Sequence, residues 1–187
     1  MYSSNIFDVA KRQNIFTEIN GQLDFLKTFA PPRAHSAYAT RRVWRVFNLA
    51  APSVNIPPFT DAYGSDYPFS VKVDKQLTPQ NLMDFNRDHY EGTQFDLTKG
   101  IAAGPYGDPN RFDMAAQPAD NLTIIDILQG SYERSISLFR TSYSFVACAR
   151  NVPDIFAFIW FSQYAPSSST YAPIYIASEI IPLSYTR

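Results

Sequence analysis

Residues 134–178, RSISLFRTSYSFVACARNVPDIFAFIWFSQYAPSSSTYAPIYIAS, decide the fold class of this chain of 187 residues. The stretch is rich in β-branched and aromatic residues, and turn-forming residues divide it into four runs. The runs that are predicted to form strands cover residues 134–140, 142–149, 155–161 and 171–178. Residues 151–154 and 165–170 are short enough to connect neighbouring strands as hairpins. The second half of the chain is therefore predicted to form an antiparallel sheet.

The first half of the chain favours helices and long loops. Apolar residues recur at helical spacing, and Thr78–Pro79 has the form of an N-cap followed by proline at the first helical position. The predicted helices cover residues 5–16, 23–29, 41–49 and 79–87. We therefore expect an α+β fold in a single domain over residues 1–187. Residues 1–130 are rich in helix and loop, and residues 131–187 supply the strands.

Composition and charge exclude several classes of protein. The chain has 16 Lys and Arg against 17 Asp and Glu, a net charge of −1, which gives no electrostatic case for nucleic acid or an anionic membrane. The longest apolar run has about seven residues, too short to cross a bilayer, and the N-terminus lacks the pattern of a signal peptide. Arg41, Arg42 and Arg45 form one basic cluster. They are interpreted as the solvated face of a helix, and the alternative is a patch that binds phosphate or nucleic acid.

The chain has a single cysteine and two histidines. Cys148 lies among apolar residues in a predicted strand and is interpreted as a buried core residue. It cannot form an intrachain disulfide, so the cysteine content does not indicate in which cellular compartment the protein works. His35 lies in a loop and is expected to face solvent. His89 stands between Asp88 and Glu91, but that spacing does not match a zinc site with three protein ligands. A structural cluster or a substrate-contacting loop is favoured there, and neither a metal nor a cofactor is predicted.

Arg140 closes the first predicted strand. In a strand, Ile136 and Leu138 would share one face with Arg134 and Arg140. If that face is buried, the guanidinium of Arg140 points at the sheet edge, where it can bind a carboxylate bidentately or orient a nucleophile. The alternative, which the sequence supports equally, is that Arg140 lies at the end of the strand and reaches into solvent.

Several stretches carry a family resemblance. The most specific are DHYEGTQFDLTKG at residues 88–100 and AGPYGDPNR at residues 103–111. YPFSVK at residues 67–72, RSISLFRTSY at 134–143, IWF at 159–161 and APS at 165–167 fit the same pattern. Over about residues 1–180 the chain resembles the dipeptidase A family of cysteine dipeptidases, also called secernin-related dipeptidases.

The resemblance implies an N-terminal-nucleophile hydrolase of four layers, αββα. In that class the nucleophile is the first residue of the mature chain, a cysteine in this family, and its own α-amino group serves as the base. This chain begins Met1-Tyr2-Ser3, so the resemblance places the cysteine-bearing segment upstream. We therefore expect the C-terminal portion of a larger dipeptidase domain, inactive by itself. A catalytically inactive, dipeptidase-like binding or structural protein is the alternative.

The resemblance, together with charge complementarity to a dipeptide, suggests roles for individual residues. Residues 88–111 are expected to line the substrate cleft. The ammonium group of a dipeptide would pair with Asp88 or Glu91, its carboxylate would pair with Arg111, and Arg140 would support the site of the nucleophile. The expected partners are a dipeptide substrate and the missing upstream segment or subunit. A homo-oligomer is a further expectation, because part of a sheet exposes apolar surface and strand edges.

Overall fold

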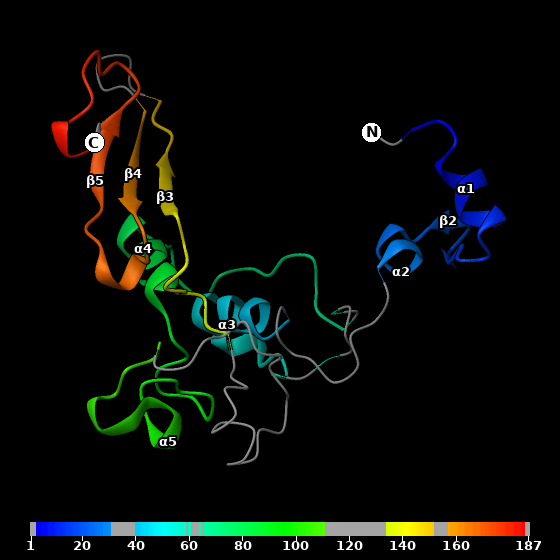
Figure 1. Ribbon diagram of the computed structural model, residues 1–187, viewed down its shortest axis with the longest axis horizontal. Coiled ribbons are helices and arrows are strands. Elements are labelled where there is room, and N and C mark those ends of the chain that lie inside the picture. The colour runs from blue at the N-terminus through cyan, green and yellow to red at the C-terminus, as the bar shows by residue number, and fades with distance from the viewer. Residues whose placement is uncertain are drawn as a thin grey trace.

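The computed structural model describes residues 3–30, 40–58, 60, 64, 66–110, 134–151 and 157–185. This part of the chain is α+β, with short helices, one two-stranded sheet and one three-stranded sheet, both antiparallel. Residues 3–30 lie apart from the remaining elements (Figure 1). Within the described ranges, no helix has the length and apolar character needed to cross a membrane.

Two short helices and a hairpin form the N-terminal part. They are α1 (Ile6–Arg12), β1 (Glu18–Ile19), β2 (Gln22–Leu23) and α2 (Phe25–Phe29). The hairpin turns at Asn20 and Gly21, which both have positive φ, as a two-residue hairpin requires. Both predicted helices here are shorter than expected. Asn14, with φ 55°, follows the end of α1, and Asp24 caps α2 by accepting a hydrogen bond from a backbone N–H of the first turn.

Of the central helices, the first two match the predictions closely, whereas the third, over residues 100–103, was not predicted. They are α3 (Thr40–Ala50), α4 (Pro79–Arg87) and α5 (Gly100–Ala103), and short 3-10 turns lie at Pro52–Val54, Gly104–Tyr106, Pro166–Ser168 and Leu183–Tyr185. Thr78 caps α4 through a reciprocal capping box with Asn81, and Pro79 is the first helical residue. On α4, Met83 is buried, whereas Leu82 is exposed.

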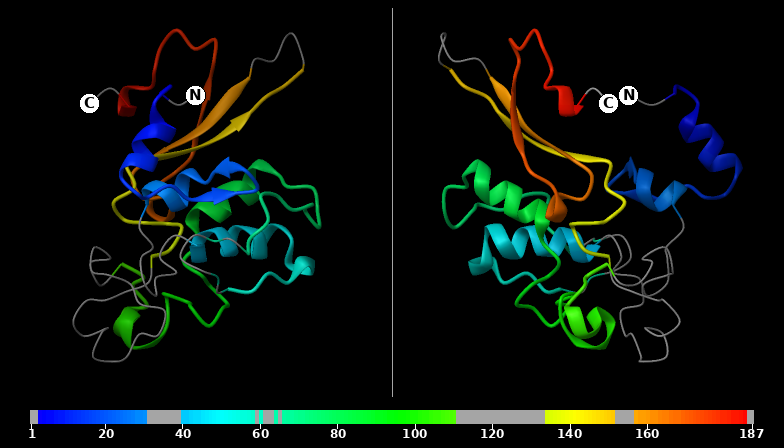
Figure 2. Two further views of the ribbon diagram at one scale, coloured as in Figure 1. Left: turned by 90° about the vertical axis from the view of Figure 1, so that its right-hand side faces the viewer. Right: turned by 60° about the vertical axis from the view of Figure 1, so that its left-hand side comes forward.

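The second half contains the predicted antiparallel sheet, with three strands instead of four. β3 (Tyr143–Cys148) pairs with β4 (Phe158–Gln163), and β4 pairs with β5 (Ala172–Tyr175). α4 covers one face, where Met83 packs with Val146 and Tyr171. Both views in Figure 2 place α4 between this sheet and α3. The other face carries Tyr143 and Phe145, each more than half exposed.

The prediction of a strand over residues 134–140 is wrong. Ser137 donates its backbone N–H to the carbonyl of Asp88 (3.0 Å), and the carbonyl of Arg134 accepts the hydroxyl of Tyr90 (2.7 Å). The segment thus bonds to the loop after α4 and bends instead of extending. Its buried residues are Ser135 and Ser137, which are completely enclosed, so the more buried side is not the one that carries Ile136, Leu138 and Arg140.

Candidate functional site

The loop that follows α4 contains the buried polar residues Asp88 and His89. Its backbone turns at Tyr90, where φ is 67°. A left-handed conformation costs a non-glycine residue roughly 1–2 kcal/mol. Tyr90 offsets this cost because it is fully buried, donates its hydroxyl to the carbonyl of Arg134, and donates its N–H to Oδ1 of Asp88 (2.9 Å). The loop is therefore held in one conformation.

A buried ion pair ties this loop to α3. Nε of Arg45 donates to Oδ1 of Asp88 (2.9 Å) and Nη2 donates to Oδ2 (2.6 Å), and both side chains are less than 10% exposed. The same guanidinium donates to the carbonyl of Glu91 (2.8 Å) and to Oδ1 of Asn48 (3.0 Å). A planar fork of donors suits this bidentate geometry. Arg45 thus fixes both ends of the turn around Tyr90.

The interpretation of the arginine cluster as a solvated helix face is wrong. Arg41 is 1% exposed, and its guanidinium lies 3.6 Å from the centre of the Phe95 ring. Trp44 packs edge-on against the same ring and donates its indole N–H to the carbonyl of Ile56 (2.9 Å). Arg41 and Arg45 point into the protein because Phe95 and Asp88, the residues that they contact, lie in the loop after α4.

Asp96 closes the second turn of the loop. Its Oδ1 accepts the backbone N–H and the hydroxyl of Thr98 (3.0 and 2.6 Å), and its Oδ2 accepts the N–H of Gly92 (3.1 Å) and lies 3.1 Å from Nζ of Lys99. Burial raises the pKa of Asp96, but the hydrogen bonds from Thr98 and Gly92 outweigh it and bring the pKa to about 2. Asp96 is therefore a structural carboxylate.

Glu91 and His89 form the accessible part of the loop. The backbone N–H of His89 donates to Oε2 of Glu91 (2.6 Å), and its ring Nδ1 lies 3.3 Å from Oε1. Burial raises the pKa of Glu91, but these contacts with His89 outweigh it and bring the pKa to about 2. The Glu91 side chain is 47% exposed, whereas that of His89 is 5% exposed. The loop thus presents one oriented, ionised carboxylate to solvent.

The ring of His89 also contains an unsatisfied atom. Its Nε2 is buried and has no hydrogen-bond partner among the described residues. Buried polar atoms usually find a partner, so this nitrogen is a second position in the loop that a bound molecule or a water can satisfy. Within the described ranges, no group of three or more His, Cys, Asp or Glu side chains could hold a metal ion.

The sequence-predicted site residues occupy different environments. Arg45 and the N–H of Tyr90 already engage the carboxylate of Asp88, so of the two proposed carboxylates Glu91 is the one that faces solvent. Arg140 is exposed, and its guanidinium lies 5.3 Å from the Phe139 ring centre. Arg111 and His35 lie outside the described residues. Cys148 is half-buried in β3.

Sequence reasoning missed the residues that hold the loop from a distance. Arg45 and Arg41 lie four residues apart, on the same helix face as Trp44. Two arginines that share a face with a tryptophan are a signal for buried, partnered cations. Ser137 offered no such signal, since it acts through its backbone N–H.

The comparisons with known proteins give one match. The family model of peptidase family C69 matches residues 1–187, the whole chain. No curated protein and no solved structure gives a significant match.

We predict that Arg45→Met lowers the free energy of unfolding by about 3–5 kcal/mol, because it leaves the charge of Asp88 buried without its partner. Urea denaturation followed by circular dichroism measures the effect. Lys99→Met, which removes an exposed partner of Asp96, is the matched control and should cost no more than about 1 kcal/mol. Equal losses in the two variants would contradict the role assigned to Arg45.

The pKa of Asp96 predicts how stability depends on pH. Its folded pKa, about 2, lies below its ordinary value of 3.8, so Asp96 contributes stability above pH 4 that is lost as the pH falls toward 2. Asp96→Asn should flatten the decline in unfolding free energy between pH 5 and pH 2.5 by on the order of 1 kcal/mol. Asp8→Asn, on α1, controls for the loss of one negative charge. A decline as steep in Asp96→Asn as in the unmodified chain would refute the assignment.

Proposed function

Because the chain belongs to peptidase family C69, the dipeptidase A family, we propose that it forms part of a dipeptidase that recognises the free ammonium group of its substrate. Membership places the chain among the peptidases, which are hydrolases. The observation that carries the finer proposal is Glu91, an ionised and half-exposed carboxylate on a loop with a fixed backbone.

The geometry of Glu91 suits the binding of a cation. Both of its oxygens are oriented by His89, so the side chain loses little rotational freedom when an ammonium group arrives. The pKa of about 2 keeps Glu91 charged through the whole neutral range. A dipeptide carries its ammonium group two bonds from the scissile carbonyl. A fixed contact to that ammonium therefore also positions the bond to be cleaved.

We assign the nucleophilic step to a cysteine at the N-terminus of the mature enzyme, in a segment upstream of residue 1. Its thiolate attacks the scissile carbonyl, its α-amino group takes the thiol proton and passes it to the leaving amine, and water then hydrolyses the thioester. Cys148 has no part in this scheme. Among the described residues, the groove that it lines contains Arg87 and Arg150 but no histidine or carboxylate that could accept a proton from the thiol.

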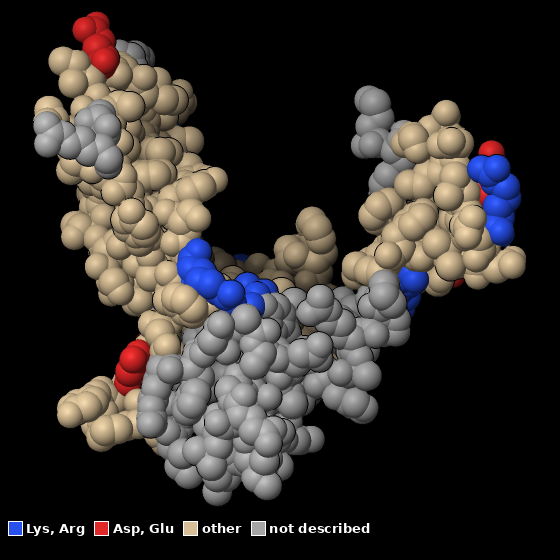
Figure 3. All heavy atoms as spheres, viewed as in Figure 1, with Lys and Arg blue, Asp and Glu red and all other residues tan. Residues whose placement is uncertain are grey.

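The finer fold proposal is a four-layer αββα arrangement in which residues 1–187 form the C-terminal portion. α4 already covers one face of the sheet. On the other face, Tyr143 stacks with Phe145 and Phe161, and the surface over β3–β5 in Figure 3 is nearly all uncharged. Two sheets pack face to face through such apolar surfaces. We propose that the upstream segment supplies the second sheet, and that Arg140, three residues before β3, supports the nucleophile at this edge.

We predict that Glu91→Gln in the active enzyme raises the KM for a free dipeptide such as Ala-Ala about fivefold, because the amide keeps the shape of Glu91 but not its charge. The KM for the N-acetylated dipeptide, which has no ammonium group, should not change. Glu179→Gln, a carboxylate exposed near the C-terminus, is the matched control. An unchanged KM for the free dipeptide would remove Glu91 from substrate binding.

We predict that Cys148→Ala retains the dipeptidase activity of the enzyme and its inactivation by iodoacetamide, because the reactive thiol is that of the N-terminal cysteine. Rates of Ala-Ala hydrolysis before and after alkylation measure both properties. Circular dichroism establishes that the variant is folded. Loss of activity in the folded variant would identify Cys148 as the nucleophile and overturn the N-terminal assignment.

A further inference from the structure

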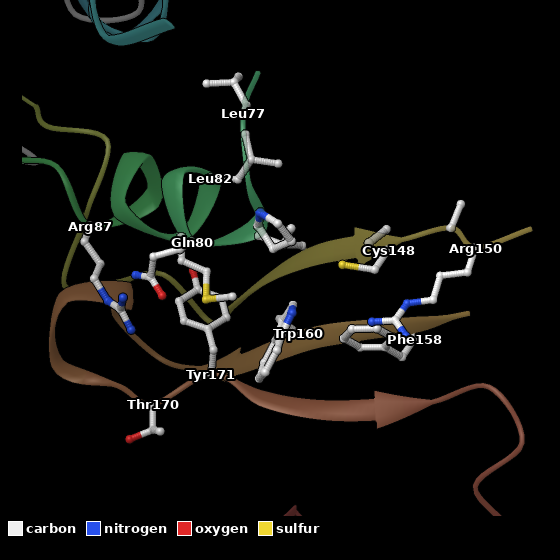
Figure 4. A pocket seen from close by; sticks show the side chains of 15 residues that line it. Leu77, Gln80, Leu82, Arg87, Cys148, Arg150, Phe158, Trp160, Thr170 and Tyr171 are labelled. Atoms are coloured by element: carbon white, nitrogen blue, oxygen red, sulfur yellow. The ribbon is translucent and has the colours of Figure 1, made fainter. Parts of the chain in front are cut away.

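A groove of about 720 Å³ lies between α4 and the sheet face that the helix partly covers. Figure 4 shows its layout: Arg87 stands at one end, Arg150 at the other, and Tyr171, Trp160 and Phe158 follow one another between them. The groove is thus an aromatic trough with a cation at each end.

Among the residues that the structure describes, the charges that line the groove have one sign. They are Arg87 and Arg150, and no described aspartate or glutamate lines it. Such an arrangement favours ligands that carry negative charge at both ends. Asp84, which lies 3.7 Å from Nη1 of Arg87, is not among the lining residues.

Arg87 is fixed by its surroundings. Its Nε and Nη2 donate to the backbone carbonyls of Pro166 (3.1 Å) and Ser169 (3.4 Å), and the guanidinium lies 5.0 Å from the centre of the Tyr171 ring. The side chain is still 32% exposed. It therefore offers a positive charge whose position is set before any ligand binds.

Arg150 is the more accessible cation. Its residue is exposed, and its guanidinium lies 4.7 Å from the centre of the Phe158 ring. A guanidinium above an aromatic ring keeps its N–H groups accessible, so it can still bind a carboxylate through two parallel hydrogen bonds.

The strand register sets the separation of the aromatic rings beside the two cations. Ala172 pairs with Phe161, so Tyr171 lies level with Ser162, four residues along β4 from Phe158. At about 3.3 Å per residue, Tyr171 and Phe158 lie about 13 Å apart along the strand direction, and each guanidinium lies about 5 Å from the centre of its ring. The separation of Tyr171 and Phe158 equals that of residues i and i+4 in an extended peptide. The residue at i+2 faces the same way and would lie over Trp160.

We propose that this groove binds an extended acidic peptide segment of a partner protein, with carboxylates four residues apart and an apolar residue midway between them. A dipeptide, about 7 Å long when extended, cannot reach both cations. The groove is therefore a site distinct from the dipeptide site assigned to Glu91, and the inference stands whether or not that assignment holds.

The probe peptide acetyl-Glu-Thr-Leu-Thr-Glu-amide tests the proposal. Cys148 lines the groove and is the sole cysteine of the 187 residues, so its alkylation by iodoacetamide, followed by mass spectrometry, reports directly on occupancy. A saturating concentration of the peptide should slow the alkylation at least about fivefold, and Arg150→Gln should weaken peptide binding about fivefold. Fluorescence polarisation of the labelled peptide gives the dissociation constants.

The controls separate charge from apolar contact. The peptide in which glutamine replaces both glutamates should bind at least about fivefold more weakly. Arg12→Gln, which removes an exposed arginine of α1, should leave binding unchanged. Failure of the acidic peptide to protect Cys148 would overturn the proposal. Equal binding of the two peptides, or equal effects of Arg150→Gln and Arg12→Gln, would do the same.

Discussion

The buried pair of Arg45 and Asp88 is the constraint on which the loop and its surroundings depend. The carboxylate of Asp88 accepts hydrogen bonds from Arg45 of α3 and from the N–H of Tyr90. Its backbone carbonyl accepts the N–H of Ser137. Removing two charges from water is costly, and this pair offsets the cost only because further hydrogen bonds satisfy the remaining donors and acceptors. The main effect of the pair is therefore to fix the geometry of the loop after α4, and its net contribution to stability is small.

That geometry explains why one carboxylate of the loop is accessible while its neighbours are buried. Asp88, His89 and Tyr90 are all less than 10% exposed, and the left-handed turn at Tyr90 then directs Glu91 outward. A loop without the arginine anchor would have to hold Tyr90 in a strained conformation by burial alone. The strain is tolerated because several contacts fix the residues on both sides of it.

The sequence predicted the elements whose signals are local. Thr78 and Pro79 predicted the start of α4. The runs of aromatic and β-branched residues predicted β3, β4 and β5. Residues 134–140 form a similar run, but their hydrogen bonds go to a loop about 45 residues earlier in the chain, and no local pattern reports that. Arg45 was misjudged for the same reason. Its charge suggested that the side chain would be exposed to solvent, but its partner, Asp88, lies 43 residues away in the sequence. Glu91 could be named from the sequence, but its exposure could not.

The two faces of the three-stranded sheet suit different kinds of contact. The face with Tyr143 and Phe145 presents exposed aromatic surface. Broad apolar contact of that kind favours lasting burial against another layer, because its strength follows area and not direction. The face toward α4 combines aromatic rings with two arginines, of which Arg87 is held by backbone carbonyls and Arg150 is exposed. Charges contribute specificity more than affinity, so the proposed acidic peptide would bind this face in one register and dissociate. In the proposed four-layer arrangement, the sheet would join another layer on one side and stay open to a ligand on the other.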